Sequence, residues 1–570
     1  MPPLPRRWEI APHAPQSYLS ALPDVHPIVA QILYSRGLTE PAEARAFLRK
    51  EPGPDNPFDL HGMHRAVDRI RRAIRQREPI AVYGDFDADG VTATALLVLT
   101  LRALGAEVHP YIPHRVREGY GLNQRAIREL AAAGTRLMIT VDCGVRSPKE
   151  IALARRLGMD VVVTDHHLVG NEPLAAVAVV NPRQPECPYP HKGLAGVGLA
   201  YKLAQALLRA NQKVPLKGSQ PLSEEDLLDL VALGTVADLA PLIGENRALV
   251  SRGLERLNRS PRPGVEALMR QAGLRPGSVN AWAIGFILAP RLNAPGRMEH
   301  ADLAYRLLIA EYPEEATRLA QRLDELNRKR QQLTAEMQER ARTIVLEQQA
   351  NWPLFFVADP EFPSGVIGLV AARLVEEFYR PTVVVEQREP VSRGSARSIP
   401  EFHIADALKA CDDLLLQHGG HASAAGFTVR TDRLNLLRDR LLEEAARKLA
   451  GLELVPVLRV DAEVPLKAMT AQLWETLQQL EPFGEGNPEP LFLTRNVQVR
   501  QAVPVGTASA HLKLTLSDGW AVWDGIAFGR GTLAREMPKR VDLVYYLRRD
   551  EWNGAVRIQL DVQDWREAEN

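Results

Sequence analysis

The sequence predicts an α/β protein in which two sheet-and-helix domains precede a third domain made mostly of β-strands. Three observations support this fold class. From about residue 80, short apolar runs alternate with helical patterns, which is typical of parallel strands covered by helices on both faces. A second, smaller strand–helix–strand alternation follows a long helical stretch. The last part of the chain alternates apolar and polar positions, which indicates a small barrel or sandwich.

The first α/β domain is predicted over residues 61–315, after a proline-rich N-terminal extension over residues 1–60. Its strands are mostly apolar and β-branched, and its helices show apolar residues at helical spacing. The predicted elements are a strand at Ile80–Tyr83, a helix at Val91–Leu104, a strand at Leu137–Val141, a helix at Pro148–Leu157 and a strand at Val161–Thr164. Such alternation predicts a parallel sheet.

A connecting helix is expected over residues 316–351, where leucines recur at helical spacing with charges between them. The smaller α/β domain should occupy residues 352–452, and the mostly β domain residues 453–570. The elements expected in the two domains are strands at Leu354–Ala358 and Thr382–Val385 around a helix at Val366–Phe378, then strands at Val497–Arg500, His511–Leu516, Val541–Leu547 and Arg557–Val562.

Composition argues against several classes of protein. Lys and Arg total 70 residues, as do Asp and Glu, so no net charge holds the chain on nucleic acid, although a local basic groove is compatible with this balance. Cys143, Cys187 and Cys411 form no CxxC pair, which argues against structural zinc and fits a reducing cytoplasm. We find neither a signal peptide nor a membrane-spanning stretch, and expect a cytoplasmic protein without membrane contact.

Acidic side chains follow three of the predicted strands. These groups are Asp85, Asp87 and Asp89 after the first strand, Asp142 after the second, Asp165-His166-His167 after the third, and a further acid, Asp238, after a helical segment. Ligands bind beyond the carboxyl ends of parallel strands. Carboxylates and imidazoles without thiolates favour Mn²⁺ or Mg²⁺. The surplus of ligands is compatible with two ions, which can hydrolyse phosphate esters.

Each of these groups also has a purely structural interpretation. Asp89 could cap the following helix, and Asp142 could end its strand in an Asx turn. Their joint occurrence at successive strand ends favours the metal site. Gly193, Gly196 and Gly198 match no nucleotide-binding motif, so we attribute them to close helix packing. No Gly-Xaa-Ser-Xaa-Gly sequence supports serine hydrolase chemistry.

These motifs resemble those of the DHH phosphoesterases, a family named for the triad that here is Asp165-His166-His167. The matching stretches are Asp85-Phe-Asp-Ala-Asp89, Asp142-Cys-Gly144, Asp165–His167, Gly234-Thr-Val-Ala-Asp238 and, in the position of the family's DHHA1 domain, Gly419–Gly426. Other stretches resemble the RecJ branch of this family: Arg115–Leu122, Pro290–Arg297, Gly394–Ile399, and Glu481–Pro488 in the position of an OB-fold domain.

The resemblance implies roles for individual residues. The implied metal ligands are Asp85, Asp87, Asp89, Asp142, His166 and Asp238. Asp142 would bridge two Mn²⁺ or Mg²⁺ ions, and Asp142, His166 and His167 would form the catalytic group. Asp85 and His167 could instead orient the ligands. The implied 5′-phosphate and DNA-binding residues are Arg115, Arg291, Asn293, Arg297, Ser395, Arg397, Gly419, Gly420 and His421.

Two positions depart from the family pattern. Tyr83 stands where many DHH enzymes carry a histidine, which would weaken the hold on one ion. Phe362-Pro363-Ser364 stands where RecJ-like chains often carry Trp-His-Pro, and we expect Phe362 still to stack on the substrate.

The resemblance implies a single-stranded-DNA-specific 5′-to-3′ exonuclease that releases 5′-mononucleotides and serves DNA repair and recombination. Its implied partners are single-stranded DNA, a helicase and a single-strand-binding protein, and we expect a monomer. One alternative is a phosphodiesterase for oligonucleotides or cyclic dinucleotides, against which the additional OB-like domain argues. Another is an inactive DNA-binding scaffold, against which the complete set of acids argues.

Overall fold

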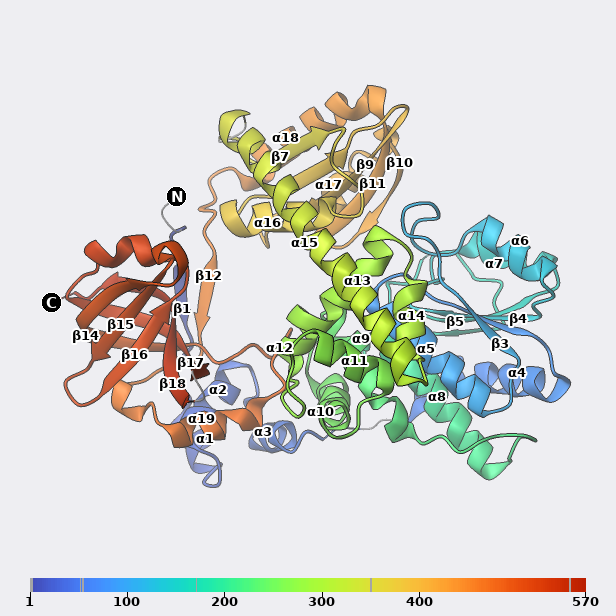
Figure 1. Ribbon diagram of the computed structural model, residues 1–570, viewed down its shortest axis with the longest axis horizontal. Helices are drawn as coiled ribbons and strands as arrows, with labels where there is room; N and C mark the ends of the chain where they lie inside the picture. The colour runs from blue at the N-terminus through green and yellow to red at the C-terminus, as the bar shows by residue number, and fades with distance from the viewer. Residues whose placement is uncertain are drawn as a thin grey trace. The chain divides into compact units, whose positions relative to one another are not determined.

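The computed structural model (Figure 1) describes residues 4–51, 53, 56–170, 172–348, 351–552 and 555–569. Its contacts divide the chain into two compact units. The larger unit is Pro52–Leu454, and the smaller unit combines Met1–Glu51 with Val455–Asn570. Most of the predicted N-terminal extension is therefore grouped with the C-terminal domain. The last predicted positions of the connecting helix, residues 349 and 350, lie outside the described residues.

The larger unit contains the expected parallel sheet, with strand order β3-β2-β4-β5-β6. The strands are β2 (Ile80–Tyr83), β3 (Val108–Tyr111), β4 (Leu137–Val141), β5 (Asp160–Thr164) and β6 (Ala178–Val180). All neighbouring pairs are parallel, so the carboxyl ends of the strands share one edge. Because β4 lies between β2 and β5, the residues that follow these three strands come together.

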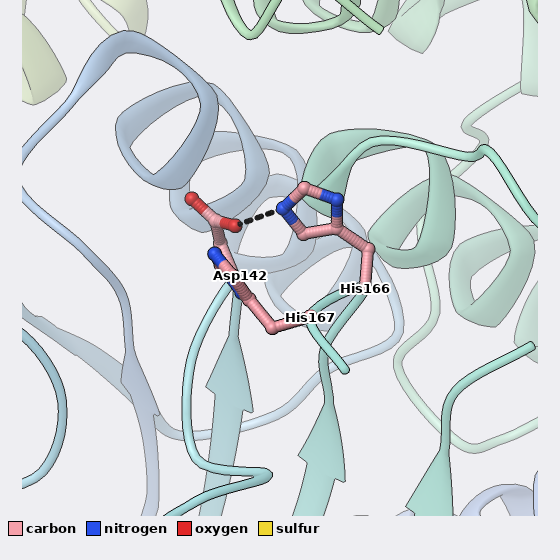
Figure 2. Close-up of side chains that lie close together, drawn as sticks. All are labelled: Asp142, His166 and His167. Atoms are coloured by element: carbon pink, nitrogen blue, oxygen red, sulfur yellow. Dashed lines mark ion pairs between the residues drawn. The ribbon is translucent and has the colours of Figure 1, made fainter. Parts of the chain in front are cut away.

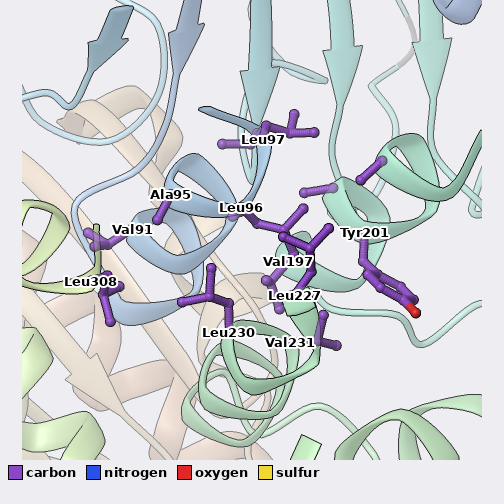
Figure 3. Close-up of a cluster of buried hydrophobic side chains, with 14 of the residues drawn as sticks. Val91, Ala95, Leu96, Leu97, Val197, Tyr201, Leu227, Leu230, Val231 and Leu308 are labelled. Atoms are coloured by element: carbon purple, nitrogen blue, oxygen red, sulfur yellow. The ribbon is translucent and has the colours of Figure 1, made fainter. Parts of the chain in front are cut away.

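Helices cover both faces of this sheet because its strands are apolar on both faces. Alternate residues such as Ala81, Tyr83 and Met138 pack beneath one pair of helices, while Ile80 and Val82 pack beneath the others. The helices are α6 (Gln124–Ala132) and α7 (Pro148–Arg156) on the first face, and α4 (Met63–Gln76), α5 (Ala88–Ala103) and α8 (Gly196–Lys213) on the second. Figure 3 shows the core between α5, α8 and the next helix, α9 (Leu228–Ala237).

A group of helices completes the first domain and leads into the second. They are α10 (Gly244–Arg259), α11 (Pro263–Gln271), α12 (Ala281–Ala283), a π-helical turn at Ile284–Leu288, α13 (Ala289–Met298), α14 (Asp302–Leu308) and α15 (Pro313–Gln348). The long helix α15 contributes Leu319 and Leu323 to the core of the first domain and Ala341 and Val345 to that of the second. It is the connecting helix that the sequence predicts.

The second domain is built on a sheet with strand order β10-β11-β9-β8-β7. Its elements are β7 (Phe355–Asp359), α16 (Ile367–Phe378), β8 (Thr382–Glu386), β9 (Val391–Arg397), α17 (Ile404–Lys409), β10 (Leu415–Gly420), β11 (Ala424–Arg430) and α18 (Leu434–Leu449). Only β7 and β8 pair in parallel. Phe362 is fully buried between this sheet and α16. The expectation that Phe362 stacks on the substrate is wrong, because its ring belongs to the core.

The smaller unit contains a closed barrel, as the alternating pattern predicts. Its strand order is β13-β14-β15-β16-β18-β17, and pairing of β14 with β17 closes it. The strands are β13 (Ala462–Glu463), β14 (Phe492–Val505), β15 (His511–Ser517), β16 (Val522–Ala527), β17 (Arg540–Trp552) and β18 (Ala555–Glu567). Closure satisfies the backbone groups that edge strands leave unpaired.

Residues from the N-terminus complete the smaller unit. Strand β1 (Arg7–Ile10) pairs in parallel with β12 (Val457–Val460). The helices packed with the barrel are α1 (Gln16–Ser20), α2 (Pro27–Ser35), α3 (Pro41–Leu48) and α19 (Ala471–Leu477). In both units, the described helices include none with the length and apolar character needed to cross a membrane.

Candidate metal centre and substrate cavity

The acidic and imidazole side chains predicted from the sequence converge at the carboxyl edge of the parallel sheet. Three groups have ligand atoms within 4.8 Å of one another: Asp85, Asp87 and Asp142; Asp142, His166 and His167; and Asp89, His166 and Asp238. All six predicted metal ligands occur in these groups. Asp142 and His166 each belong to two groups, so neighbouring sites would share them.

Asp142 occupies the centre of the cluster in an unusual backbone conformation. Its φ of 61° lies in the left-handed region, which costs free energy for residues other than glycine but is tolerated best by Asp and Asn. The residue lies against Gly196, where a Cβ atom would approach Asp142 Cβ to 2.6 Å. Figure 2 shows the Asp142 carboxylate directed at His166, with 3.0 Å between Oδ1 and Nε2.

The first acidic loop also organises two helix N-termini. Asp87 Oδ1 accepts a hydrogen bond from the Gly90 amide at 3.0 Å, so Asp87 rather than Asp89 caps α5. Asp89 accepts hydrogen bonds from the amides of Gly196 and Val197, both at 2.7 Å, at the start of α8. Sequence reasoning attributes Gly196 to helix packing, but the atoms nearest to a Cβ atom at this position belong to Asp142, and the Gly196 amide anchors Asp89.

His167 is oriented by two neighbours. Its Nδ1 lies 2.7 Å from Asp165 Oδ1, and Asp165 also accepts a hydrogen bond from the Val145 amide. Burial alone would raise the pKa of Asp165, but His167 and the backbone donors outweigh it and hold this pKa below its usual value.

The Tyr120 hydroxyl lies 3.1 Å from His167 Nδ1 and donates to the Asp142 carbonyl oxygen. Sequence reasoning missed Tyr120, although it falls inside the quoted Arg115–Leu122 stretch.

The electrostatics of the cluster fit a bound divalent cation. Burial, reinforced by neighbouring carboxylates, raises the pKa values of Asp85, Asp142 and Asp238 well above the usual value and that of Asp89 to about 7. Burial lowers the pKa of His166 to about 3, which keeps its imidazole neutral and able to ligate a metal. Among the described residues, buried Asp85 Oδ1 has no hydrogen-bond partner. A bound cation would reduce the repulsion between the carboxylates and would give Asp85 Oδ1 a partner.

A cavity of about 810 Å³ opens onto this cluster and is lined by both α/β domains. Its acidic and imidazole lining includes Asp85, Asp87, Asp142, Asp165, His167 and Asp238. Of the predicted DNA-binding residues, it includes Arg115, Arg297, Ser395, Arg397, Gly419, Gly420 and His421. The structure thus places a carboxylate cluster and a group of arginines around one space.

Arg291 and Asn293, also predicted to bind DNA, lie outside the residues that line the cavity. Arg291 Nε donates to Asp324 Oδ1 at 2.9 Å, which ties α13 to α15. Asn293 Oδ1 accepts a hydrogen bond from the Ala88 amide at 2.8 Å, which ties α13 to the start of α5. The geometry gives both residues a part in holding the helices of the first domain together.

Strand β9 contributes two arginines and a serine to the cavity lining. Arg393, Ser395 and Arg397 alternate along this strand, so their side chains share one face, and all three line the cavity. Sequence reasoning missed Arg393, although the period of two in Arg-Gly-Ser-Ala-Arg is a signal that could have found it. Arg397 donates to Ser395 Oγ at 3.2 Å and to the Ala396 carbonyl at 2.8 Å. Burial and the nearby Arg115 lower the pKa of Arg397.

Tyr83 lies away from the ligand groups. Its ring stacks on Tyr111 with centroids 4.9 Å apart, and its hydroxyl donates to the Gly121 carbonyl at 3.1 Å. The side chain therefore packs in the core beneath α6 and supports the loop that carries Tyr120.

Family models match three parts of the chain. The DHH family N-terminal domain matches residues 79–235, the DHHA1 domain residues 352–447 and the RecJ OB domain residues 460–564. The single-stranded-DNA-specific exonuclease RecJ of Bacillus subtilis (strain 168) is 40% identical over 565 residues, which cover 98% of this chain and 70% of that relative. The chain belongs to the RecJ family. The RecJ of Thermus thermophilus is 36% identical over 530 residues, 92% of this chain and 74% of that relative.

Solved RecJ structures agree with this assignment. The crystal structure of Thermus thermophilus RecJ in complex with Mn²⁺ matches with a TM-score of 0.84 at 33% identity, covering 99% of this chain and 80% of that one. Its complex with Mg²⁺ matches with a TM-score of 0.79 at 32% identity, covering 99% and 79%. The predicted order of DHH, DHHA1 and OB folds is confirmed.

Proposed function

We propose that this RecJ-family chain is a metal-dependent exonuclease that acts on single-stranded DNA, removes 5′-mononucleotides from the 5′ end, and serves DNA repair and recombination. One observation carries the proposal: a single cavity is lined by members of the acid and imidazole cluster and also by Arg115, Arg297 and Arg397. Such a cavity can hold one phosphate of a strand while the next phosphate is hydrolysed. The Bacillus subtilis and Thermus thermophilus relatives are named single-stranded-DNA-specific exonucleases.

The chain offers ligands for two Mn²⁺ or Mg²⁺ ions. The ligands we propose are Asp85, Asp87, Asp89, Asp142, His166 and Asp238, with Asp142 shared because it belongs to two of the ligand groups. When bound, such ions activate water and neutralise the oxygens that gain charge during phosphodiester hydrolysis. Asp165 and Tyr120 orient His167 toward the same space.

The arginines that line the cavity determine the direction in which the strand is cleaved. Arg397 presents a planar guanidinium, which binds phosphate through paired hydrogen bonds. Arg115 and Arg397 repel each other, so an anion between them would be held more strongly than by either alone. We place the terminal 5′-phosphate there, with Ser395, Gly419 and His421 on the same lining. The next phosphate along the strand would then lie at the acids, and the product would be a 5′-mononucleotide.

Single-strand specificity follows from the closure of the cavity. Arg393 donates to the Val116 carbonyl at 2.6 Å, and Arg297 donates to the Gly365 carbonyl at 3.1 Å. Both hydrogen bonds join the DHH domain to the DHHA1 domain across the cavity wall. A complementary strand would need to break these contacts before it could enter beside its partner.

Cleavage of matched DNA substrates tests this function. With Mn²⁺, we expect hydrolysis of linear single strands, little hydrolysis of blunt duplex and none of circular single strands, and we expect EDTA to stop the reaction. Cleavage of the circle would identify an endonuclease instead. Equal rates on single strand and duplex would contradict the proposed closure.

The OB barrel supports a long strand as the substrate, because OB folds hold single strands through basic grooves and exposed aromatic rings. A cyclic dinucleotide or short oligonucleotide requires no such domain. Because the strand must be unpaired before it enters the cavity, we propose a helicase and a single-strand-binding protein as partners. We also propose that the protein acts as a monomer in the cytoplasm.

A further inference from the structure

Two aromatic side chains lie exposed and stacked beside the start of α13. Trp282 of α12 is 57% exposed, and Phe286, one turn later, is 71% exposed. Their ring centroids are 5.6 Å apart and their planes differ by 24°, so the rings stack on each other. We call this pair the aromatic shelf. Scattered exposed apolar residues are ordinary, whereas exposed apolar groups that gather in one place mark interaction sites.

The backbone beneath the aromatic shelf is connected to the metal centre. Phe286 lies in the π-helical turn Ile284–Leu288, a rare conformation that is frequently found at functional sites. A Cβ atom at Gly285 would lie 3.8 Å from a methyl group of Val236, so this turn packs against the last turn of α9. That helix is capped by Asp238, which lines the cavity. One helix end therefore supports both the shelf and a proposed metal ligand.

Helix α13 gives the distance from the aromatic shelf to the cavity. It begins immediately after the π-helical turn, and its residue Arg297 belongs to the cavity lining. At ~1.5 Å per residue, the backbone from Phe286 to Arg297 spans about 16 Å. A DNA strand that rises ~3.4 Å per nucleotide crosses this span in about five nucleotides. The shelf therefore lies within reach of a strand whose end is held in the cavity.

We propose that the aromatic shelf stacks unpaired bases of the DNA strand on the 3′ side of the scissile phosphate. This inference rests on the proposed exonuclease function. Every base has a flat π-face, so stacking on Trp and Phe holds a strand without regard to sequence. The occupant is the substrate rather than a second protein because α13, which begins beside the shelf, carries Arg297 into the lining of the cavity that holds the strand's end. Stacking there would keep the strand aligned with the cavity as its end is removed.

Binding without metal tests the shelf separately from cleavage. A 5′-phosphorylated oligonucleotide would carry 2-aminopurine at one position at a time, with EDTA present to prevent hydrolysis. In the unmodified protein we expect fluorescence quenching by stacking roughly three to six nucleotides from the 5′ end. The double variant Trp282→Ala/Phe286→Ala should lose this quenching, and its affinity should fall roughly tenfold per lost stacked base. Tyr312→Ala removes a similarly exposed ring immediately before α15 and should change neither result.

Cleavage with Mn²⁺ gives a second readout. The double variant should raise KM for a long single strand by roughly tenfold or more, with a smaller effect on a trinucleotide that cannot reach the shelf. Trp282→Phe/Phe286→Tyr should restore most of the lost affinity, and unchanged thermal melting would show that the variants fold.

Unchanged quenching in the double alanine variant, or equal losses on the long strand and the trinucleotide, would overturn the proposal. So would normal DNA binding combined with lost self-association or lost protein binding, because the shelf would then be a protein interface. If the unmodified protein showed quenching yet cleaved no DNA, the exonuclease assignment would fail while the shelf remained.

Discussion

Replacing Arg397 by Ala should make the enzyme insensitive to the chemistry of the 5′ end. The guanidinium lies in the cavity beside Ser395, and burial together with the positive charge of Arg115 lowers its pKa. A hydrogen bond between charged partners contributes about 1.5–3 kcal/mol. The substitution should therefore lower kcat/KM on 5′-phosphorylated DNA by about tenfold to a hundredfold. DNA with a 5′-hydroxyl offers no phosphate to this site, so the penalty there should be much smaller.

The assay is a double-mutant cycle in which one change is the substitution and the other is removal of the 5′-phosphate. Arg430→Ala serves as the matched control, because Arg430 ends β11 of the same sheet and forms an exposed ion pair with Asp432. Arg397→Lys should recover part of the activity, since a single charge remains but the planar fork is lost. An equal penalty on both substrates would refute the assignment of Arg397 as the reader of the terminal phosphate.

Three further predictions concern the metal centre and the barrel. Loss of a residue that only orients a metal ligand lowers activity by up to ~100-fold, and Asp142→Asn should lower kcat by more than this. DNA affinity measured by anisotropy should stay near that of the unmodified protein. Normal cleavage would exclude Asp142 as a shared ligand. Burial and Asp87 raise the pKa of Asp89 to about 7, so this carboxyl is protonated at lower pH. The affinity for Mn²⁺ should therefore increase by up to about tenfold per pH unit between pH 6 and 8. A Mn²⁺ affinity that calorimetry finds to be independent of pH would contradict this. Trp520→Ala, which removes an 86% exposed ring from the barrel, should raise KM on long strands by roughly fivefold to a hundredfold with little change in kcat; an unchanged KM would assign the barrel another role.

The sequence predicts the parallel strands closely because their signal is local. Ile80–Tyr83 and Leu137–Val141 are observed with the predicted boundaries, since strands buried on both faces are uninterrupted apolar runs that end where the acids begin. The gathering of the acids follows from the same topology. Carboxyl ends of neighbouring parallel strands meet at one edge, so Asp85, Asp142 and His166 could be placed together from the sequence alone.

Features that depend on distant parts of the chain could not be predicted in this way. Strand β1 pairs with β12, and no local pattern near the N-terminus indicates a partner hundreds of residues away. The aromatic character of Phe362 does not reveal whether it faces substrate or core. Arg291 lies in a motif-like stretch, yet its partner Asp324 is on another helix, so only the packing of α13 against α15 reveals its structural part.

The fate of end labels tests the central claim most directly. A long single strand with a 5′-phosphate, labelled at either the 5′ or the 3′ end, would be digested with Mn²⁺ and sampled before each strand has lost more than a few nucleotides. The structure predicts that the 5′ label appears at once as a mononucleotide, while the 3′ label remains on a strand that shortens step by step. Early release of the 3′ label, or release of the 5′ label on a longer oligonucleotide, would contradict the proposed mechanism. In that mechanism the arginines hold the 5′-phosphate, and the next phosphodiester is hydrolysed at the metal ions that the acids would bind.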